Sequence, residues 1–564
     1  MNNKEAIAKI LAKQTKLKED EILSILEVPS NPELGDIAFP CFKLSSIYKK
    51  NPIEIAKELE SKIKITKDLE KIKATGPYLN FFLEKSNLAI EVIKKILKEK
   101  EKFGTEKNKQ TIMIEFPSPN TNKPLHLGHL RNMSLGESVS RILEHKGNKI
   151  IRANLNNDRG VHICKSMYAY EKWGKNKTPE SEKIKSDHLI GDYYVMFSKA
   201  AKENPALEEE AQKILQKWES GDKKTIALWK KMNKWAFDGF KETYKLFGIK
   251  HDKQYYESEI YGQGKELAQE GLNKNIFIKK DNAIIADLTD EKLGEKVILR
   301  ADGTSIYITQ DMYLAILKDK EYKLDGSIYV VANEQDYHFQ VLFTILKKFG
   351  YKFTKNLHHL SYGMVELPEG RMKSREGTVV DADDLILETQ KLAKTEIKKR
   401  FPKLSEKELN IRSLKIALSA IKFMLLKTDH VKNIIFNPNE AISFEGDTGP
   451  YIQYSYARAS SILKKSKKKP EIKLTSKILK EKEILLIKKL AEFPEVIENA
   501  QRNLSPSIIS NYTLELAHIF NEFYHQTKVL DSENEIFLLA LVESFRIVCK
   551  KSLYLLGIET VEEM

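Results

Sequence analysis

A short stretch around two histidines is the feature that most constrains how this chain can fold. The apolar run TIMIEF at 111–116 is typical of a buried strand, and a segment with helical spacing follows from about residue 130. Between them lies SPNTNKPLHLGH, residues 118–129. A strand, a glycine-containing turn and a helix beginning near Gly128 place backbone N–H groups and the positive helix end at the carboxyl edge of a parallel sheet. Because anions and nucleotides bind at that edge, the stretch predicts a nucleotide site.

The two histidines, His126 and His129, are predicted to face this site. Imidazole N–H groups can donate to phosphate oxygens as charge builds during displacement at phosphorus, and the glycine between them lets a nucleotide approach the backbone closely. Lys123 adds a positive charge at the same turn. The alternatives are surface histidines or a zinc site. Zinc needs further ligands at metal-like spacing, which only the isolated pair His162 and Cys164 offers, so we predict no protein-bound zinc and no other metal centre.

Three regions of the 564-residue chain differ in pattern. Residues 1–105 mix short helical and extended patterns, which predicts a small α+β domain. From 106 to 405, apolar strands alternate with helical patterns, which predicts an α/β domain built on a parallel sheet with crossover helices. Long helical segments between about 170 and 290 interrupt that alternation, so we interpret them as an insertion. Residues 406–564 show almost only helical patterns, which predicts an all-α helix bundle.

Composition adds information on partners and location. The formal net charge of +14 favours a polyanionic partner such as nucleic acid, although a lysine-rich surface that only keeps a protein soluble explains it equally well. The three cysteines are too scattered for a disulfide framework, and no apolar run approaches the ~18 residues that cross a bilayer. The first residues show no apolar core followed by a cleavage site. We therefore expect a cytoplasmic protein without a membrane partner.

A second candidate element for phosphate binding lies in EGRMKSREGTVVDADDLI, residues 369–386. Gly370 and Gly377 flank a run of cationic side chains, which is typical of a mobile loop that closes over a triphosphate. The alternative is a solvated basic loop, and the loop taken alone favours that alternative.

Near it in sequence, KVILRADGTSIYI at 296–308 alternates apolar and polar residues around Asp302 and Gly303. This pattern predicts a β-hairpin with these two residues at its turn, and a structural rather than a catalytic role for them.

These motifs resemble those of a known family. HLGH at 126–129 is similar to the His-Ile-Gly-His signature of class I aminoacyl-tRNA synthetases, and RMKSR at 371–375 resembles their KMSKS signature in degraded form. Across nearly its whole length the chain resembles the arginyl-tRNA synthetases specifically. The stretches that carry this resemblance are VPSNPELGDIAFP, GPYLNFFL, EFPSPNTNKPLHLGHLRN, LIGDYYVMF, LRADGTSIYITQDMYLA, YVVANEQDYHFQ, RMKSREGTVV, GPYIQYSYARASSIL and LLGIETVEEM.

The resemblance implies a Rossmann-type catalytic domain that joins L-arginine to ATP and releases pyrophosphate. It then passes the arginyl group to the 2′-hydroxyl of the terminal adenosine of tRNA(Arg), with Mg²⁺ accompanying ATP. The first step needs no general base, because a free α-carboxylate, with a pKa of roughly 3.5, is already ionised at pH 7. The resemblance also implies that residues 1–105 contact the tRNA elbow through the region of Asn80 and Phe81, and that 406–564 bind the anticodon. We expect a monomer.

By the same resemblance, His126 and His129 contact the phosphates of ATP and Gly128 admits the nucleotide. Glu334 and His338 are also implied as ATP-binding residues.

The loop that resembles the second signature is expected to hold the pyrophosphate end through Met372, Lys373, Ser374 and Arg375. It departs from the general class I pattern, because Ser374 stands where that pattern has its second lysine. Arginyl-tRNA synthetases often lack this lysine and carry one just before the first signature. We therefore assign the substitute charge to Lys123.

Arginine recognition is implied for Glu115, Tyr307 and Asp311, with Asn120 and Gln335 near the α-amino end. A guanidinium has five donors in a rigid plane and keeps its charge, so its pocket needs a carboxylate in bidentate reach and further acceptors. Without the resemblance, Glu115 is better explained as a surface charge at a strand end, Tyr307 as a strand residue and Asp311 as a helix N-cap.

For tRNA binding, YIQYSYARASSI at 451–462 places Tyr451, Tyr454 and Arg458 on one helical face, which suits stacking on unpaired bases and pairing with phosphates. A core helix whose tyrosines pack inward is an equal alternative on the sequence pattern. The resemblance favours anticodon recognition, with Met564 nearby.

Three other functions are compatible with parts of the sequence. A small-cofactor nucleotidyltransferase shares the strand, His-x-Gly-His and helix, but it is short and lacks a basic helical domain after the second loop. Another class I synthetase, such as the cysteinyl or glutaminyl type, is the nearest enzyme alternative. A non-catalytic tRNA-binding paralogue retains fold and charge, although His126, Gly128 and His129 are intact in this chain.

Overall fold

The computed structural model describes residues 3–29, 31–66, 68–301, 306–368, 380–474 and 479–564. The chain forms two units, which divide its C-terminal helices between them. The first unit consists of Met1–Lys100, Ile462–Glu492 and Ile519–Ile547. The second consists of Glu101–Ser461, Phe493–His518 and Val548–Met564.

The N-terminal part of the first unit is an α+β fold, as predicted. Its antiparallel sheet has the order β1-β3-β2, so β3 lies between its two neighbours. Local sequence explains the flanking helices: Asn51 caps the N-terminus of α4 by accepting from the N–H of Ile53, and Pro52 supplies the first turn. The elements are α1 Asn3–Ala12, α2 Glu19–Leu23, η1 Pro32–Leu34, β1 Ile37–Pro40, α3 Phe42–Tyr48, α4 Pro52–Lys62, β2 Leu69–Thr75, β3 Tyr78–Leu83 and α5 Lys85–Glu99.

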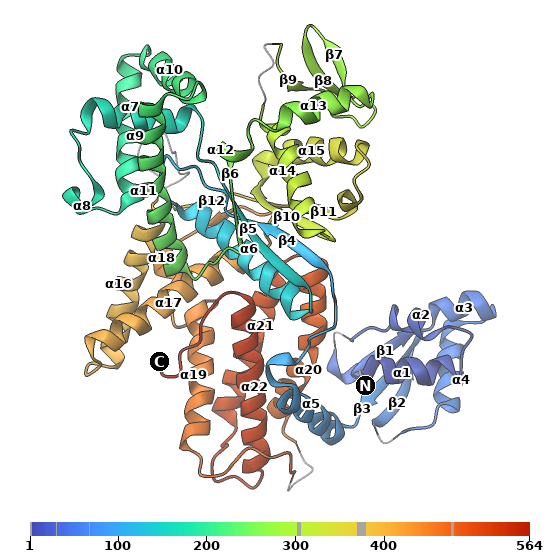
Figure 1. Cartoon of the computed structure of the whole chain (residues 1–564). Helices are drawn as coiled ribbons and strands as arrows, with labels where there is room; N and C mark the ends of the chain where they lie inside the picture. Colours follow the sequence, from blue (N-terminus) through green and yellow to red (C-terminus); the bar gives the residue numbers. More distant parts are fainter. Residues whose placement is uncertain (1–2, 30, 67, 302–305, 369–379, 475–478) are drawn as a thin grey trace. The chain divides into compact units, whose positions relative to one another are not determined.

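The second unit is built around a five-stranded sheet of order β11-β10-β4-β5-β6, in which every neighbouring pair is parallel. This confirms the predicted α/β domain with a parallel sheet. The strands are β4 Thr111–Glu115, β5 Lys149–Asn156, β6 Lys253–Tyr256, β10 Gly326–Ala332 and β11 Leu357–Tyr362. Helix α6, Leu127–His145, packs against β4, β5 and β10, and Figure 1 shows it alongside the sheet.

The helix α6 is buried on nearly all sides, and its close approach to the chain after β4 depends on a glycine. An ideal Cβ built on Gly136 would lie 2.4 Å from a ring carbon of Phe116, the residue that follows β4. Phe116 itself is fully buried. The absence of a side chain at Gly136 therefore allows the helix that carries the histidine motif to sit against the strand that precedes it.

Between β5 and β6 the chain forms the helices of the predicted insertion, which share a core of aromatic and aliphatic side chains around Tyr170, Tyr193 and Phe197. These helices are α7 Val161–Trp173, α8 Pro179–Glu182, α9 Ser186–Glu203, α10 Leu207–Glu219 and α11 Lys223–Phe247. The helical insertion ends before residue 253, where the chain returns to the central sheet as β6.

The rest of the segment predicted as helical insertion contains a second sheet. The strands β7 Ile278–Lys280, β8 Ala283–Leu288 and β9 Gly294–Leu299 form an antiparallel sheet in that order, and the helices α12 Glu257–Ile260 and α13 Gly264–Asn273 precede it. The sequence pattern indicated β9 only in part, as the first strand of the hairpin predicted at 296–308. It did not indicate β7 and β8, because each is short and carries charged residues.

The hairpin predicted at 296–308 is wrong in its second half. Asp302 and Gly303 lie outside the described residues, but Tyr307 begins helix α14, Tyr307–Tyr322, and Asp311 lies within it rather than at its N-cap, which is Ile306. The alternation Ile306-Tyr307-Ile308 resembled a strand. Tertiary packing decides for helix, because Ile308 and Met312, four residues apart, are both buried on one face.

From residue 406 on, the described residues form helices and one short strand, β13, which confirms the predicted helical C-terminal part. The elements after α14 complete the fold. They are η3 Asn333–Gln335, α15 Asp336–Lys348, η4 Lys352–Asn356, β12 Val365–Glu366, α16 Ala382–Arg400, α17 Glu406–Leu426, β13 Ile434–Ile435, α18 Pro438–Ala441, α19 Gly449–Lys465, α20 Glu481–Arg502, α21 Pro506–Gln526 and α22 Glu535–Leu555. Within the first unit, Phe520 and Phe545 stack with ring centroids 3.8 Å apart. Among the described residues, no helix has the length and apolar character needed to cross a membrane.

We predict that Gly136→Ala lowers the stability of the protein by about 1–3 kcal/mol, because the new methyl group overlaps the buried ring of Phe116 and forces α6 or the ring to shift. Thermal unfolding measures the effect. Gly262→Ala is the matched control, since a Cβ there meets nothing within 4 Å. Equal unfolding temperatures of the two variants would contradict this account of the packing.

Candidate active site

The histidine motif forms the N-terminus of α6, where both imidazoles accept hydrogen bonds from the backbone. Nδ1 of His126 accepts from the N–H of Gly128 at 3.2 Å, and Nδ1 of His129 accepts from the N–H of His126 at 3.1 Å. The two rings lie with centroids 3.9 Å apart. Because each Nδ1 is an acceptor, each neutral ring carries its proton on Nε2. The motif therefore presents two Nε2–H donors at the positive end of the helix.

Electrostatics keeps both rings neutral. Burial and the ammonium of Lys123 lower the pKa of His126 to about 3. Burial, His126 and Lys123 together hold the pKa of His129 well below its usual value. Burial also lowers the pKa of Lys123. The charge at this end of the site therefore comes from the lysine and the helix, while the histidines act as neutral donors.

The segment that follows the second predicted loop pairs with this motif. Leu127 N–H donates to the carbonyl of Val380, and Ala382 N–H donates to that of Leu125. A pocket of about 210 Å³ lies beside them and is lined by Lys123, Pro124, Leu125, His126, His188, Gly191, Asp192, Tyr194, Val195 and Asp381. Met372, Lys373, Ser374 and Arg375, predicted to hold pyrophosphate, lie outside the described residues.

One cluster at the rim of this pocket has metal-ligand chemistry, namely Asp187, His188 and Asp383. Cations of the protein already occupy it: Nζ of Lys185 lies 2.5 Å from Asp383 and 3.2 Å from Asp187. Hydrogen bonds from His188 to Asp381 and Asp383 raise the pKa of His188 to about 10, so its ring is an imidazolium and not a metal ligand. The donor set does not fit a resident metal ion.

Two carboxylates predicted to recognise arginine are each paired with a cationic or titratable side chain. Glu115 at the end of β4 is buried, and its Oε2 lies 2.5 Å from Nζ of Lys318. It is not the surface charge that the strand-end position alone suggested. Burial disfavours the Lys318 ammonium, but Glu115, Tyr329 and Asp311 together outweigh it and raise the pKa of Lys318. Asp311 on α14 lies 2.6 Å from Nε2 of His338 on α15.

The other residues predicted for the pocket also lie near the carboxyl ends of the strands, and their side chains are more exposed than that of Glu115. Asn120, which follows β4, forms a backbone bridge with Asn157, which follows β5. Tyr307 on the first turn of α14 is 71% exposed. Glu334 and Gln335 belong to η3 at the carboxyl end of β10 and are exposed. The sheet thus brings the predicted residues to one edge, where Lys318 pairs with Glu115 and His338 contacts Asp311.

Two charged residues at this edge were not predicted from the sequence, Arg159 and Glu257. Arg159 follows β5, and Glu257 begins α12 directly after β6. Burial raises the pKa of Glu257 to about 7, with Asp158 and Asp311 acting in the same direction and Arg159 against it. Arg159, like Glu115, is a charged residue near the carboxyl end of an apolar strand, but the resemblance selected only Glu115. Glu257 gave no such indication, because β6 has four residues and no apolar run.

The predicted anticodon-binding residues lie on α19. The guanidinium of Arg458 stacks over the ring of Tyr454, 4.3 Å from its centroid, and the hydroxyl of Tyr451 lies 3.0 Å from Nδ1 of His518. The tail that ends at Met564 is held nearby: Gln453 donates to the carbonyl of Glu559 at 2.6 Å. Tyr451 and Tyr454 are half-buried, so each ring packs partly against the core and remains partly accessible.

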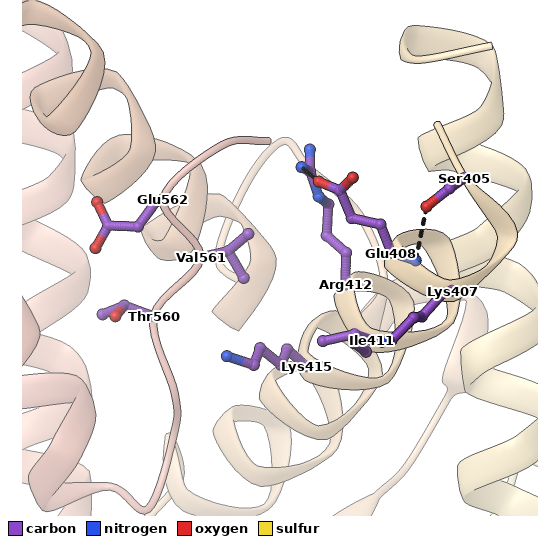
Figure 2. Close-up of a pocket in the computed structure, with 9 residues that line it drawn as sticks. All are labelled: Ser405, Lys407, Glu408, Ile411, Arg412, Lys415, Thr560, Val561 and Glu562. Atoms are coloured by element: carbon purple, nitrogen blue, oxygen red, sulfur yellow. Dashed lines mark hydrogen bonds and ion pairs between the residues drawn. The ribbon is translucent and has the colours of Figure 1, made fainter. Parts of the chain in front are cut away.

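A second pocket, of about 350 Å³, separates α17 from this C-terminal tail (Figure 2). Ser405, Lys407, Glu408, Ile411, Arg412 and Lys415 line one side, and Thr560, Val561 and Glu562 the other. Figure 2 shows the head groups of Arg412 and Glu408 together, 2.6 Å apart. The lining carries both signs of charge and none of the predicted site residues.

In the N-terminal domain, Asn80 and Phe81 lie in β3 and are 3% and 0% exposed. Phe81 therefore offers no ring surface for stacking on a base, because its side chain fills the core. The exposed aromatic surface nearby is Phe42, whose ring meets that of Tyr78 edge-on at 5.7 Å.

The parallel sheet with a His-x-Gly-His helix start at its carboxyl edge defines the catalytic fold of class I aminoacyl-tRNA synthetases. The family model described as "tRNA synthetases class I (R), catalytic domain" matches residues 92–438. The "Arginyl tRNA synthetase N terminal domain" matches 1–83, and the "DALR anticodon binding domain" matches 452–564.

Individual proteins agree with these models. An arginine–tRNA ligase of Treponema denticola is 48% identical over 90% of this chain and 89% of its own length. One of Borrelia hermsii is 45% identical over 99% of this chain and 97% of its own. The solved structure of Thermus thermophilus arginyl-tRNA synthetase superposes with a TM-score of 0.83 at 26% identity, covering 100% of this chain and 99% of that one. The chain belongs to the arginyl-tRNA synthetase family and functions as an arginine–tRNA ligase.

The neutral state of His126 leads to a prediction about pH. The folded ring has a pKa of about 3 against 6.5 in a free histidine, so the unfolded chain takes up a proton below pH 6.5 that the folded chain refuses. This group therefore costs about 1.4 kcal/mol of stability for each pH unit between about pH 6 and 4. His126→Asn keeps an acceptor for the Gly128 N–H and removes that titration.

Denaturant unfolding measured across this pH range is expected to show a shallower loss of stability in His126→Asn than in the unsubstituted protein. His525→Asn is the control, since His525 is exposed and its replacement should leave the slope unchanged. Identical slopes for His126→Asn and the parent would show that the His126 ring is not held neutral.

Proposed function

We propose that the chain activates L-arginine with ATP at the carboxyl edge of its parallel sheet and transfers the arginyl group to the 2′-hydroxyl of the terminal adenosine of tRNA(Arg). The observation that carries this proposal is the pair of neutral Nε2–H donors of His126 and His129 beside Lys123. Neutral donors at a helix N-terminus stabilise negative charge without needing to lose a proton. That is what an in-line displacement at the α-phosphate requires.

ATP is the substrate of the first step, with its phosphates at His126 and His129 and its nucleoside against Gly128. Lys123 supplies the charge that a second lysine supplies in other class I enzymes, and Glu334 and His338 complete the nucleotide site. Mg²⁺ belongs to the ATP, because the one metal-like cluster among the described residues is filled by Lys185. The segment 372–375 is proposed to bind the pyrophosphate end.

The guanidinium of L-arginine is proposed to lie between Asp311 and Glu115, with Tyr307 over it and Asn120 and Gln335 at the α-amino end. Each of these carboxylates has a resident partner that fixes its orientation, since Lys318 pairs with Glu115 and His338 contacts Asp311. Glu257 joins this group, because its carboxyl is buried and lies within the electrostatic influence of Asp311. A lysine or citrulline competitor leaves acceptors of this pocket unpaired, and such sites reject analogues by on the order of 10⁴ or more.

The anticodon is proposed to bind along α19, where Arg458 and Tyr454 offer a cation and a ring, with Tyr451 and the tail at Met564 alongside. The tRNA elbow is proposed to bind the N-terminal domain near Asn80 and Phe81. There Phe42 provides an exposed ring that meets the half-buried ring of Tyr78, while Phe81 lies in the core.

We also propose that the protein is a monomer and that it works in the cytoplasm. The cytoplasmic location is supported by Cys41, Cys164 and Cys549, which are all buried free thiols and suit a reducing compartment.

Arginine-dependent ATP–pyrophosphate exchange, measured with and without tRNA(Arg), tests the proposal. We expect exchange with arginine among the amino acids, and only when tRNA is present. Exchange with a different amino acid would move the specificity and remove the pocket assignment. No exchange under any condition, with tRNA still bound, would favour a binding protein without catalysis.

We predict that Lys123→Ala lowers the rate of arginine activation by about 10²-fold, because it removes the charge beside the two imidazoles, and preorganised donors at a transition state are worth that much. Single-turnover adenylate formation at saturating ATP and arginine, with tRNA(Arg) present, measures it. Lys109→Ala, an exposed lysine before β4, is the control and should keep the parent rate. An unchanged rate in Lys123→Ala would remove Lys123 from the catalytic machinery.

A further inference from the structure

The side chain of Arg159 lies in a cage of aromatic rings and carboxylates at the carboxyl end of β5. Its guanidinium carbon is 4.0 Å from the ring centroid of Tyr261 and 5.5 Å from that of Trp218. Nη2 lies 2.5 Å from Glu219 at the end of α10, and the side chain is 11% exposed. Stacking and pairing together hold a guanidinium in one plane, which a lysine ammonium does not achieve. The cage therefore fixes both the position and the plane of this charge.

The opposite side of Arg159 faces Glu257. Nη1 of Arg159 lies 3.9 Å from Oε1 of Glu257, whose side chain is 8% exposed. The backbone next to Glu257 is fixed by the neighbour of Arg159 in sequence: Asp158 accepts from the N–H and from the hydroxyl of Ser258, at 2.8 and 2.7 Å. Asp158 and Arg159, which follow β5, thus contact Ser258 and Glu257, which follow β6.

The charge of Glu257 depends on this arrangement. Burial, Asp158 and Asp311 all raise its pKa, while Arg159 acts against them, and the result is a pKa of about 7. Burial and the charge of Glu257 raise the pKa of Tyr307, so the phenol lies within the electrostatic influence of the same carboxyl. Loss of the Arg159 charge removes the opposing attraction and leaves Glu257 protonated at neutral pH. A protonated carboxyl no longer offers an arginine guanidinium a full charge or two acceptors.

Arg159 does not make the surroundings repulsive to a cationic substrate. Its single charge is matched by two carboxylates, Glu219 and Glu257, so the cage retains an excess of negative charge. Its guanidinium lies flat on Tyr261, where the ring also attracts it.

We propose that Arg159 is a positioning residue for arginine recognition, whose caged guanidinium keeps the Glu257 carboxylate charged and directed to the pocket that Asp311 and Tyr307 border. This inference rests on the proposed placement of the arginine pocket. It assigns specificity to a residue that does not itself touch the substrate.

A pair of substitutions at one position separates the charge of Arg159 from its packing. Arg159→Gln removes the charge and Arg159→Lys retains it. The measurement is the KM for arginine and for ATP in tRNA aminoacylation, at saturating tRNA(Arg), from about pH 6 to pH 9. Circular dichroism and thermal unfolding confirm that each variant is folded.

Arg159→Gln is expected to raise the KM for arginine about tenfold at pH 6.5, because one pKa unit corresponds to a tenfold change in the charged fraction. The KM should return to within about twofold of the parent at pH 9, where Glu257 ionises without help. The kcat at saturating arginine and the KM for ATP should stay at the parent values, since only substrate binding is altered. Arg159→Lys should keep the parent pH midpoint.

An unchanged KM for arginine in Arg159→Gln overturns the inference, and so does a rise of equal size at every pH, which indicates lost packing only. If Arg159→Gln does not fold, Arg159→Lys decides: the parent midpoint supports the inference, and a rise independent of pH overturns it. Glu257→Gln distinguishes a failure of the proposed arginine pocket from a failure of the role of Arg159. If Glu257→Gln leaves the KM for arginine unchanged, the proposed position of the pocket is wrong. If Glu257→Gln raises that KM while Arg159→Gln does not, only the role of Arg159 is wrong.

Discussion

The hydrogen bond from Gly128 N–H to Nδ1 of His126 is the interaction on which the arrangement of the site depends. It caps α6 with a side chain that is itself part of the phosphate-binding motif, so the same contact begins the helix and sets the tautomer of the ring. The bond from His126 N–H to Nδ1 of His129 completes this cap and sets the tautomer of the second ring. Burial then keeps both rings uncharged, and the helix end and Lys123 supply the positive potential.

The position of this helix at the sheet edge depends on two features of α6. Gly136 has no side chain and so allows close contact with Phe116. Arg131 fixes the helix by donating to the carbonyls of Met364, His430 and Lys432, far along the chain. The segment 380–382 pairs with Leu125 and Leu127. Residues about 250 positions apart thus meet at one site, because a parallel sheet brings every strand's carboxyl end to one edge.

The sequence was sufficient for those features that depend on local pattern. The strand before the histidines, the helix after them, the parallel sheet and the helical C-terminal part all follow from periodicity. Glu115 does not, because its strand-end position alone suggested a surface charge and only the family resemblance selected it. Features that depend on tertiary contacts were missed. The apolar alternation at Ile306–Ile308 suggested a strand, yet it is the start of α14, and the four-residue β6 gave no pattern from which Glu257 could be selected.

The site also shows why motif residues alone do not define a binding pocket. Glu115 is held by Lys318, Asp311 by His338 and Glu257 by Arg159, so these three acidic residues have partners in the free chain. A buried carboxylate without a partner protonates and loses its attraction for a cation. Residues that pair with these carboxylates come from α14, α15 and the end of β5, and no short motif contains them. Selectivity for a guanidinium therefore depends on these resident partners as much as on the acids that meet the substrate.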